Sequence, residues 1–163
     1  MLIGILSDSH GRTETTALAV RAVGERGAEL VLHLGDIETE AVIDELAAAN
    51  ARIVFGNCDW DTDRLRRYAE GAGVTVDHPM GMLEVAGKRI AWTHGHLDHL
   101  MAEALDAGVD YLFHGHSHEL RDERIGSTRV INPGALFRAR RYTAALLDPA
   151  SDTLSIVEVT RRS

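Results

Sequence analysis

The sequence predicts an α/β fold in which two packed β-sheets are flanked by helices. Up to Glu70, short apolar runs alternate with helical patterns. This alternation is typical of parallel strands joined by helices. After Gly73 the segments become shorter and richer in strand signals, with one further helical pattern among them. The alternation of strands and helices in the first half and the strand-rich second half together favour two sheets over a single doubly wound sheet.

The first half is expected to alternate strand and helix. Leu2–Leu6 is an apolar run typical of a buried strand, and the polar turn Ser7–Gly11 ends it. The helix after it can be capped by Thr13 or Thr15 and is expected to end at Gly27. Further strands are predicted at Leu30–Leu34 and Arg52–Phe55, and further helices at Glu38–Ala49 and Asp61–Glu70.

The second half is expected to be mainly β-structure. A hairpin turn is predicted at Gly87-Lys88, between strands Met82–Val85 and Arg89–Thr93, and a helix at Leu97–Ala107. The remaining strands are expected at Tyr111–Phe113, Arg129–Ile131, Thr143–Leu147 and Leu154–Val159. The sequence has no internal repeat or linker, so we expect one domain over residues 1–163.

The composition predicts a soluble, cytoplasmic protein. No apolar run reaches the roughly 20 residues of a membrane span, and no basic signal segment precedes the first strand. Cys58 is the only cysteine, so no internal disulfide is possible. The net charge of −8 should repel nucleic acid and anionic membranes, although surplus carboxylates are also a common solubility device. We expect no stable complex with nucleic acid or membrane, and a homo-oligomer is compatible with the sequence.

Polar motifs follow three successive predicted strands. They are Asp8-Ser9-His10, Gly35-Asp36 and Gly56-Asn57-Cys58-Asp59. Each alone is common in turns and helix caps. The carboxyl ends of strands converge at the ligand-binding edge of an α/β sheet, so three in succession favour a binding site.

Five histidines gather at two later strand ends. They lie in His94-Gly95-His96 and in His114–His118. Imidazoles two residues apart on an extended segment project to the same side. Carboxylate, imidazole and amide oxygen together suit Mn²⁺, Zn²⁺ or Fe²⁺, whereas a lone histidine is usually a core or surface residue. The clustering therefore predicts a divalent metal site.

In this order, the motifs D-x-H, G-D, G-N-x-D, H-G-H and G-H-x-H resemble those of the calcineurin-like metallophosphoesterases. The short chain with GNCD, GHSH and INPG resembles their small YfcE-like phosphodiesterase branch. The resemblance covers nearly the whole chain and implies a four-layer α-β-β-α sandwich of two mixed sheets. It implies one metal held by Asp8, His10 and His118, a second held by Asn57, His94 and His116, and Asp36 bridging both.

The implied activity is hydrolysis of a phosphate ester, expected to be a phosphodiester, by a water or hydroxide activated between two divalent ions. Asp36, Asn57 and His96 are the expected catalytic residues, and the ions are expected to be Mn, Ni, Zn or Fe. The expected partner is a small phosphate ester whose identity the sequence leaves open.

The proton donor is less clear, because many relatives carry histidine where this chain has Cys58. His96 is our candidate, since it adjoins His94 and an imidazole titrates near pH 6.5. A hydrogen-bonding role for His96 is equally open. Cys58 as a nucleophile is disfavoured, because no basic neighbour lowers its pKa.

Other polar residues have weaker assignments. Asp59 is expected to accept hydrogen bonds from Asn57 or a nearby histidine. Asn132-Pro133-Gly134 is a turn by composition, and the resemblance places it near the site. Three arginines either form a solvated edge or bind a second phosphate group: Arg138, Arg140 and Arg141.

Two rival interpretations remain. His94–His99 also matches the H-x-H-x-D-H pattern of metallo-β-lactamase-like hydrolases, but that fold leaves Asp8, Asp36 and Asn57 unexplained. The second rival is a non-catalytic scaffold with a phosphoesterase fold, as in a retromer subunit. All seven ligand positions carry competent side chains, which weakens the scaffold interpretation.

Overall fold

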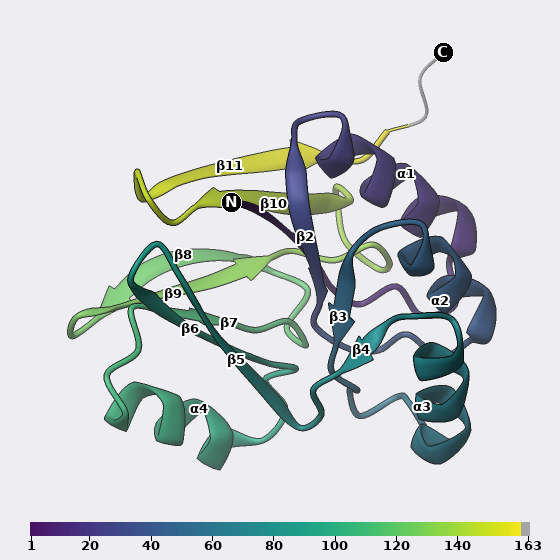
Figure 1. Ribbon diagram of the computed structural model, residues 1–163, viewed down its shortest axis with the longest axis horizontal. Coiled ribbons are helices and arrows are strands. Elements are labelled where there is room, and N and C mark those ends of the chain that lie inside the picture. The colour runs from purple at the N-terminus through teal and green to yellow at the C-terminus, as the bar shows by residue number, and fades with distance from the viewer. Residues whose placement is uncertain (161–163) are drawn as a thin grey trace.

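The computed structural model describes residues 1–160, which form two mixed β-sheets and four helices (Figure 1). The six-stranded sheet has the order β11 (Thr153–Glu158), β10 (Thr143–Asp148), β1 (Leu2–Leu6), β2 (Ala28–His33), β3 (Ala51–Ile53), β4 (Thr75–Val76). The five-stranded sheet has the order β5 (Met80–Val85), β6 (Lys88–Thr93), β7 (Tyr111–Phe113), β9 (Thr128–Pro133), β8 (Leu120–Ile125). Strands β1 to β4 are parallel, as are β6, β7 and β9, so their carboxyl ends share common edges.

The helices cover the outer faces of the two sheets (Figure 1). Three of them lie on the six-stranded sheet: α1 (Thr13–Gly24), α2 (Glu40–Ala47) and α3 (Thr62–Gly71). The fourth, α4 (Asp98–Asp106), packs on the five-stranded sheet through Ala104 against Ala91 and Leu112. The predicted four-layer α-β-β-α sandwich is confirmed.

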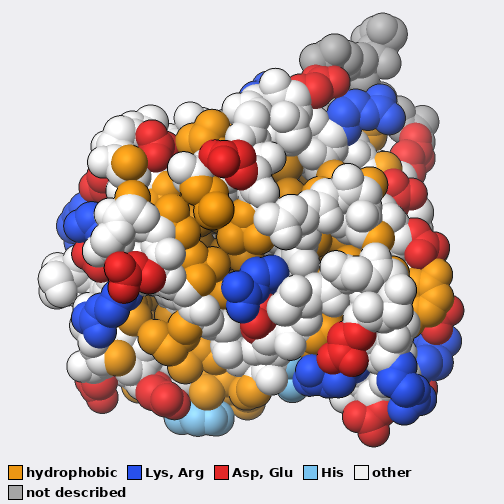
Figure 2. Space-filling view, in the orientation of Figure 1, with side chains coloured by type: hydrophobic (Ala, Val, Ile, Leu, Met, Phe, Trp, Pro, Cys, Tyr) orange, Lys and Arg blue, Asp and Glu red, His pale blue; other side chains and the backbone are white. Residues whose placement is uncertain are grey.

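The central core lies between the sheets. Ile5 and Leu32 from one sheet share a buried cluster with Trp92 and Phe113 from the other. Leu6 instead faces the helices, so β1 is buried on both sides and reads as an unbroken apolar run. Apolar side chains also reach the surface between β5 and β11 (Figure 2), near the half-buried Leu83 and Leu154.

Several element bounds shift by a few residues, and four further details differ from the sequence-based prediction. Strands β4 and β8 were not predicted, because β4 has two residues and β8 is polar and largely exposed. The hairpin turn is Ala86-Gly87 and not Gly87-Lys88, since Val85 pairs directly with Lys88. Helix α2 begins at Glu40 rather than Glu38, because Glu38 has φ +68° and its N–H donates to Asp59.

The helices are short elements of a layered fold. In the described part of the chain, none is long and apolar enough to span a bilayer.

Candidate metal centre

The structure brings the seven predicted ligand residues to one edge of the sandwich. Asp8, Asp36 and Asn57 follow β1, β2 and β3 of one sheet. The histidines come from the other sheet, where His94 follows β6 and the loop after β7 carries His116 and His118. Both sheets therefore contribute side chains to the same cluster.

One group of side chains contains Asp8, His10 and His118, whose potential ligand atoms lie within 4.8 Å of one another. The Nε2 atom of His118 lies 3.3 Å from Asp8 Oδ1 and 3.3 Å from His10 Nε2. Asp8 Oδ1 is buried and accepts no hydrogen bond in the described structure. Buried acceptors normally have partners, so an oxygen facing two imidazole nitrogens in this way fits a cation.

A second group is centred on His94, which is fully buried. Its Nδ1 lies 2.7 Å from the Leu34 carbonyl oxygen, so Nδ1 carries a proton and the carbonyl holds the ring with Nε2 towards the cluster. That Nε2 lies 3.0 Å from Asn57 Oδ1. The ring of His116 packs edge-on against His94, with centroids 5.2 Å apart.

Asp36 lies between the two groups. Its Oδ2 is 3.4 Å from His10 Nε2 and 3.4 Å from His94 Nε2, while its Oδ1 accepts the Cys58 N–H at 2.8 Å. Burial acts to raise the pKa of Asp36, but the hydrogen bond and charge of His94 lower the pKa below its ordinary value. Asp36 is therefore an ionised carboxylate that faces one histidine of each group.

The backbone of the cluster is strained. Asp8, Asp36, His116 and His118 have φ values of +56°, +56°, +67° and +58°. Non-glycine residues rarely adopt this left-handed conformation, and it costs on the order of 1 kcal/mol per residue. Such strain persists only where surrounding contacts enforce it, and it gathers at functional sites.

Gly115 allows the two sheets to approach each other here. A Cβ atom at this position would collide with Ser7 Oγ and would lie 2.6 Å from Asp8 Oδ2. The His116 N–H donates to the same Asp8 oxygen at 3.1 Å. Glycine is thus required for the histidine loop to reach the Asp8 turn.

Asp59 organises the turn around Asp36. Its buried carboxylate accepts the backbone N–H groups of Asp36, Ile37, Glu38 and Gly56. Burial raises the pKa of Asp59, and the N–H bonds oppose that shift. The expectation that Asp59 pairs with Asn57 or a histidine was wrong, because its oxygens are taken by the backbone.

Two further contacts were missed in the sequence. The carboxylate of Glu38 lies 2.7 Å from His10 Nδ1, on the side of the ring opposite the cluster. The Asn132 amide donates to the Gly115 carbonyl and to Ser117 Oγ, each at 3.0 Å, and so holds the second histidine loop. Glu38 lacked a distinguishing signal, because an acidic residue near a helix start is commonplace.

His96 lies beside the candidate ligand histidines, with ring centroids 5.2 Å from His94 and 6.2 Å from His116. Its Nδ1 is buried without a hydrogen-bond partner in the described structure. Burial, followed by the charges of His94 and His116, lowers the pKa of His96. The lowered pKa leaves a minor protonated fraction near neutral pH, and as a general acid His96 would act through that fraction.

Cys58 borders the cluster close to His10 and Asp36. Burial and the charge of Asp36 raise the pKa of the Cys58 thiol to about 11. The thiolate is the nucleophilic form, so this environment argues against Cys58 as a nucleophile at neutral pH.

The metallo-β-lactamase interpretation was wrong. Asp98 and His99, which that pattern requires as ligands, are exposed at the start of α4.

Comparisons with known proteins agree with this architecture. The family model of the calcineurin-like phosphoesterase superfamily domain matches residues 1–152. The chain is 30% identical over 138 residues to phosphodiesterase MJ0936 of Methanocaldococcus jannaschii, covering 82% of this chain and 83% of that protein. It is 26% identical over 183 aligned positions to phosphodiesterase YfcE of Escherichia coli K12, covering 100% and 95%. The solved structure of an archaeal phosphodiesterase superimposes with a TM-score of 0.88 at 27% identity, covering 97% of this chain and 99% of that one.

Proposed function

Because the chain belongs to the calcineurin-like phosphoesterase superfamily, we propose that it is a phosphodiesterase that works with two divalent metal ions. Asp8, His10 and His118 would hold one ion. Asn57, His94 and His116 would hold the other, and Asp36 would contact both. The position of Asp36 Oδ2, at 3.4 Å from one histidine of each group, is the observation that carries this assignment. An anion between two cations screens their mutual repulsion.

When bound, the ions supply Lewis-acid charge to the phosphoryl oxygens and lower the pKa of a water molecule towards neutrality. The chain contributes negative charge through Asp8 and Asp36 and fixed imidazole orientations through Leu34 and Glu38. Such an imidazole-rich set suits Mn²⁺, Ni²⁺, Zn²⁺ or Fe²⁺ better than Mg²⁺, and manganese is the ion we expect to support most activity.

Catalysis accounts for the cluster better than a scaffold role does. A scaffold has no need for seven convergent ligand side chains, several of them held in strained backbone conformations. The substrate is proposed to be a small phosphate ester, because a chain of net charge −8 is repelled by polyanions such as nucleic acid.

The test combines metal analysis with turnover. Purified protein should bind close to two Mn²⁺ ions per chain. It should hydrolyse bis-p-nitrophenyl phosphate faster than p-nitrophenyl phosphate, and faster with Mn²⁺ or Ni²⁺ than with Mg²⁺. Protein stripped by a chelator is the matched control.

Two results would contradict the proposal in different ways. A Mg²⁺-dependent monoesterase would overturn the substrate class. Full metal occupancy without turnover of any phosphate ester would support the scaffold interpretation.

A further inference from the structure

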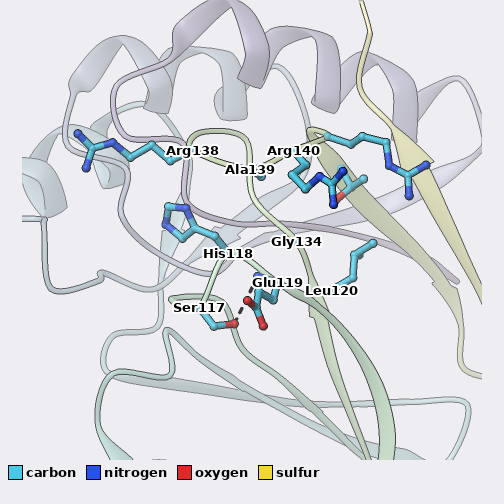
Figure 3. Close-up of a pocket in the computed structure, with 10 residues that line it drawn as sticks. Ser117, His118, Glu119, Leu120, Gly134, Arg138, Ala139 and Arg140 are labelled. Carbon is cyan, nitrogen blue, oxygen red and sulfur yellow. Dashed lines mark hydrogen bonds between the residues drawn. The ribbon is translucent and has the colours of Figure 1, made fainter.

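A cavity of about 720 Å³ opens beside His118 (Figure 3). Ser117, Glu119 and Gly134 form part of its wall, and three arginines complete its edge: Arg138, Arg140 and Arg141. Ligand pockets commonly enclose about 300 to 1,000 Å³, so this volume suits a small organic phosphate. The cavity shares His118 with the candidate metal centre, which makes the two sites adjacent.

The arginines give this cavity a local excess of positive charge. In Figure 3, Arg138 and Arg140 leave the loop on opposite sides, above His118. Arg141 lies 3.8 Å from Glu158 and is partly neutralised, whereas Arg138 and Arg140 have no carboxylate partner in residues 1–160. Glu119 is the single acidic residue of the lining. In a chain of net charge −8, unpaired guanidinium groups at one cavity are suited to bind an anion.

The three arginines lie in the loop of residues 134–142 between β9 and β10, called the arginine loop below. Hydrogen bonds connect this loop to the turn that carries Asp8. At its ends, Thr143 Oγ donates to the Pro133 carbonyl at 2.8 Å, and the Leu136 N–H donates to the Ser7 carbonyl at 3.2 Å, next to Asp8. Within the loop, the Arg138 guanidinium lies 5.2 Å from the centre of the Phe137 ring. That ring is in turn 5.4 Å from the His10 ring. Arg138 is thus separated from a ligand histidine by a single side chain.

We propose that this cavity is a subsite for a second, non-scissile phosphate, so that the preferred substrate is a phosphodiester carrying an additional phosphate group. This inference rests on the proposed phosphodiesterase function. Arg140 binds the second phosphate through charge-assisted hydrogen bonds, and Arg138, on the other side of the loop, adds positive charge at the cavity, while the ester to be cleaved lies at the metal centre.

A matched pair of chromogenic esters tests the subsite. Thymidine 5′-(p-nitrophenyl phosphate) is compared with the same compound bearing a 3′-phosphate, using Mn²⁺-loaded protein. We expect kcat/KM to be about tenfold higher for the 3′-phosphorylated ester, the scale of one or two added charge-assisted hydrogen bonds. In the double variant R138Q/R140Q the ratio between the two esters should fall towards one.

The control variant is Arg67→Gln, which makes a single charge change of the same kind at an exposed arginine of α3, away from the cavity. It should keep the tenfold ratio. A ratio near one in the wild type, or a ratio that persists in R138Q/R140Q, would overturn the subsite.

Binding measurements separate this inference from the proposed function. If the wild type cleaves neither ester, the phosphodiesterase proposal fails. Calorimetry with thymidine 3′,5′-bisphosphate and thymidine 5′-monophosphate then still tests whether the cavity binds a second phosphate. The bisphosphate should bind about tenfold more tightly to the wild type and with equal affinity to R138Q/R140Q. Equal binding of both nucleotides by the wild type would rule the subsite out.

Discussion

Strands β7 and β9 carry polar clusters at both of their ends, and the two clusters are built differently. At the amino end, Arg129 bonds Asp122 and Asp152 at 2.7 Å each, and the Tyr111 hydroxyl donates to Asp152 at 2.7 Å. Arg124 also binds Asp152 at 2.7 Å. Each carboxylate there has a guanidinium partner, and the Arg129 hydrogen bond lowers the pKa of Asp122.

At the carboxyl end, carboxylates and imidazoles face one another without such cations. Asp8 Oδ1 is buried with no hydrogen bond in the described structure, and His10 and His118 point their Nε2 atoms at each other across 3.3 Å. Candidate ligand residues such as Asp36 and His116 also adopt left-handed φ values. In the first cluster each carboxylate is paired with a guanidinium group, whereas the second cluster has the side chains to bind a cation. The comparison favours a stabilising role for the cluster at the amino end and a functional role for the cluster at the carboxyl end.

The largest expected effect is at the metal centre. Asp36→Ala should remove more metal than any other single ligand change, because Asp36 Oδ2 lies 3.4 Å from one histidine of each group. Phosphodiesterase activity should fall by about 10³-fold or more, the scale of losing metal-based charge stabilisation. Metal analysis of Asp36→Ala beside Asn57→Ala measures this. Equal metal loss in the two variants would contradict the bridging assignment.

The next effect separates His96 from Cys58. His96→Ala should slow hydrolysis of an alkyl phosphodiester by about 10²-fold, the usual scale of general acid catalysis. A nitrophenyl ester should be less affected, because its leaving group needs little protonation. Cys58→Ser, the neighbouring control, should keep most activity. Joint loss of metal and activity in His96→Ala would show that His96 only orients its neighbours. Loss of turnover with both metals bound in Cys58→Ser would give the thiol a chemical role.

A smaller effect concerns pH and His33, the fully buried histidine whose Nε2 lies 2.6 Å from Ser9 Oγ. Burial lowers the pKa of His33 to about 3, so the unfolded chain takes up a proton at a pH where the folded chain does not. The resulting stability is present above pH 6.5 and is lost as the pH falls towards 3. Between pH 7 and pH 5 the loss is about 2 kcal/mol.

Urea unfolding of metal-free protein at the two pH values measures this loss. His33→Asn should reduce the difference between pH 7 and pH 5 by about 2 kcal/mol. His99→Asn, which changes an exposed imidazole of α4, is the control and should leave it unaltered. An unchanged pH dependence in His33→Asn would contradict the assignment to His33.

The smallest effect is expected at the amino end of β7 and β9, where the ion pairs of Arg129 lie. Arg129→Met should lower the free energy of unfolding by about 1 kcal/mol, because its partners are nearly half exposed and solvent weakens their ion pairs. Metal content and turnover should stay unchanged, with Arg67→Met as the control. Loss of metal in Arg129→Met would show that the two clusters are coupled and would contradict their separate roles.

The sequence identified the side chains that gather in the candidate metal centre, but it did not identify the contacts that support them. The ligand candidates follow strands, and strand ends meet at an edge for topological reasons that periodicity reveals. The assignment of Asp59 failed, because its partners are backbone N–H groups of residues near Asp36, more than 20 positions away. No local pattern encodes such a contact.

The predictions of helices and strands also succeeded where the signal was local and failed where long-range pairing defines the element. Buried strands such as Leu2–Leu6 were predicted with their observed bounds, since an apolar run bounded by a turn is a local signal. Strand β8, with the polar sequence LRDERI, was missed because pairing with β9 defines it and apolar alternation does not. The arginine loop, by contrast, was visible as three arginines with two competing interpretations.

The sequence by itself determined the α/β class, the order of the motifs and the chemical nature of the candidate ligands, because these depend on residue type and local periodicity. Only the tertiary structure decided which histidine faces which carboxylate, that Asp36 lies between the two groups, and that Arg138 and Arg140 border a cavity next to His118. These relations join residues from different sheets and loops. They depend on how the two sheets pack, down to the space that Gly115 leaves for Asp8.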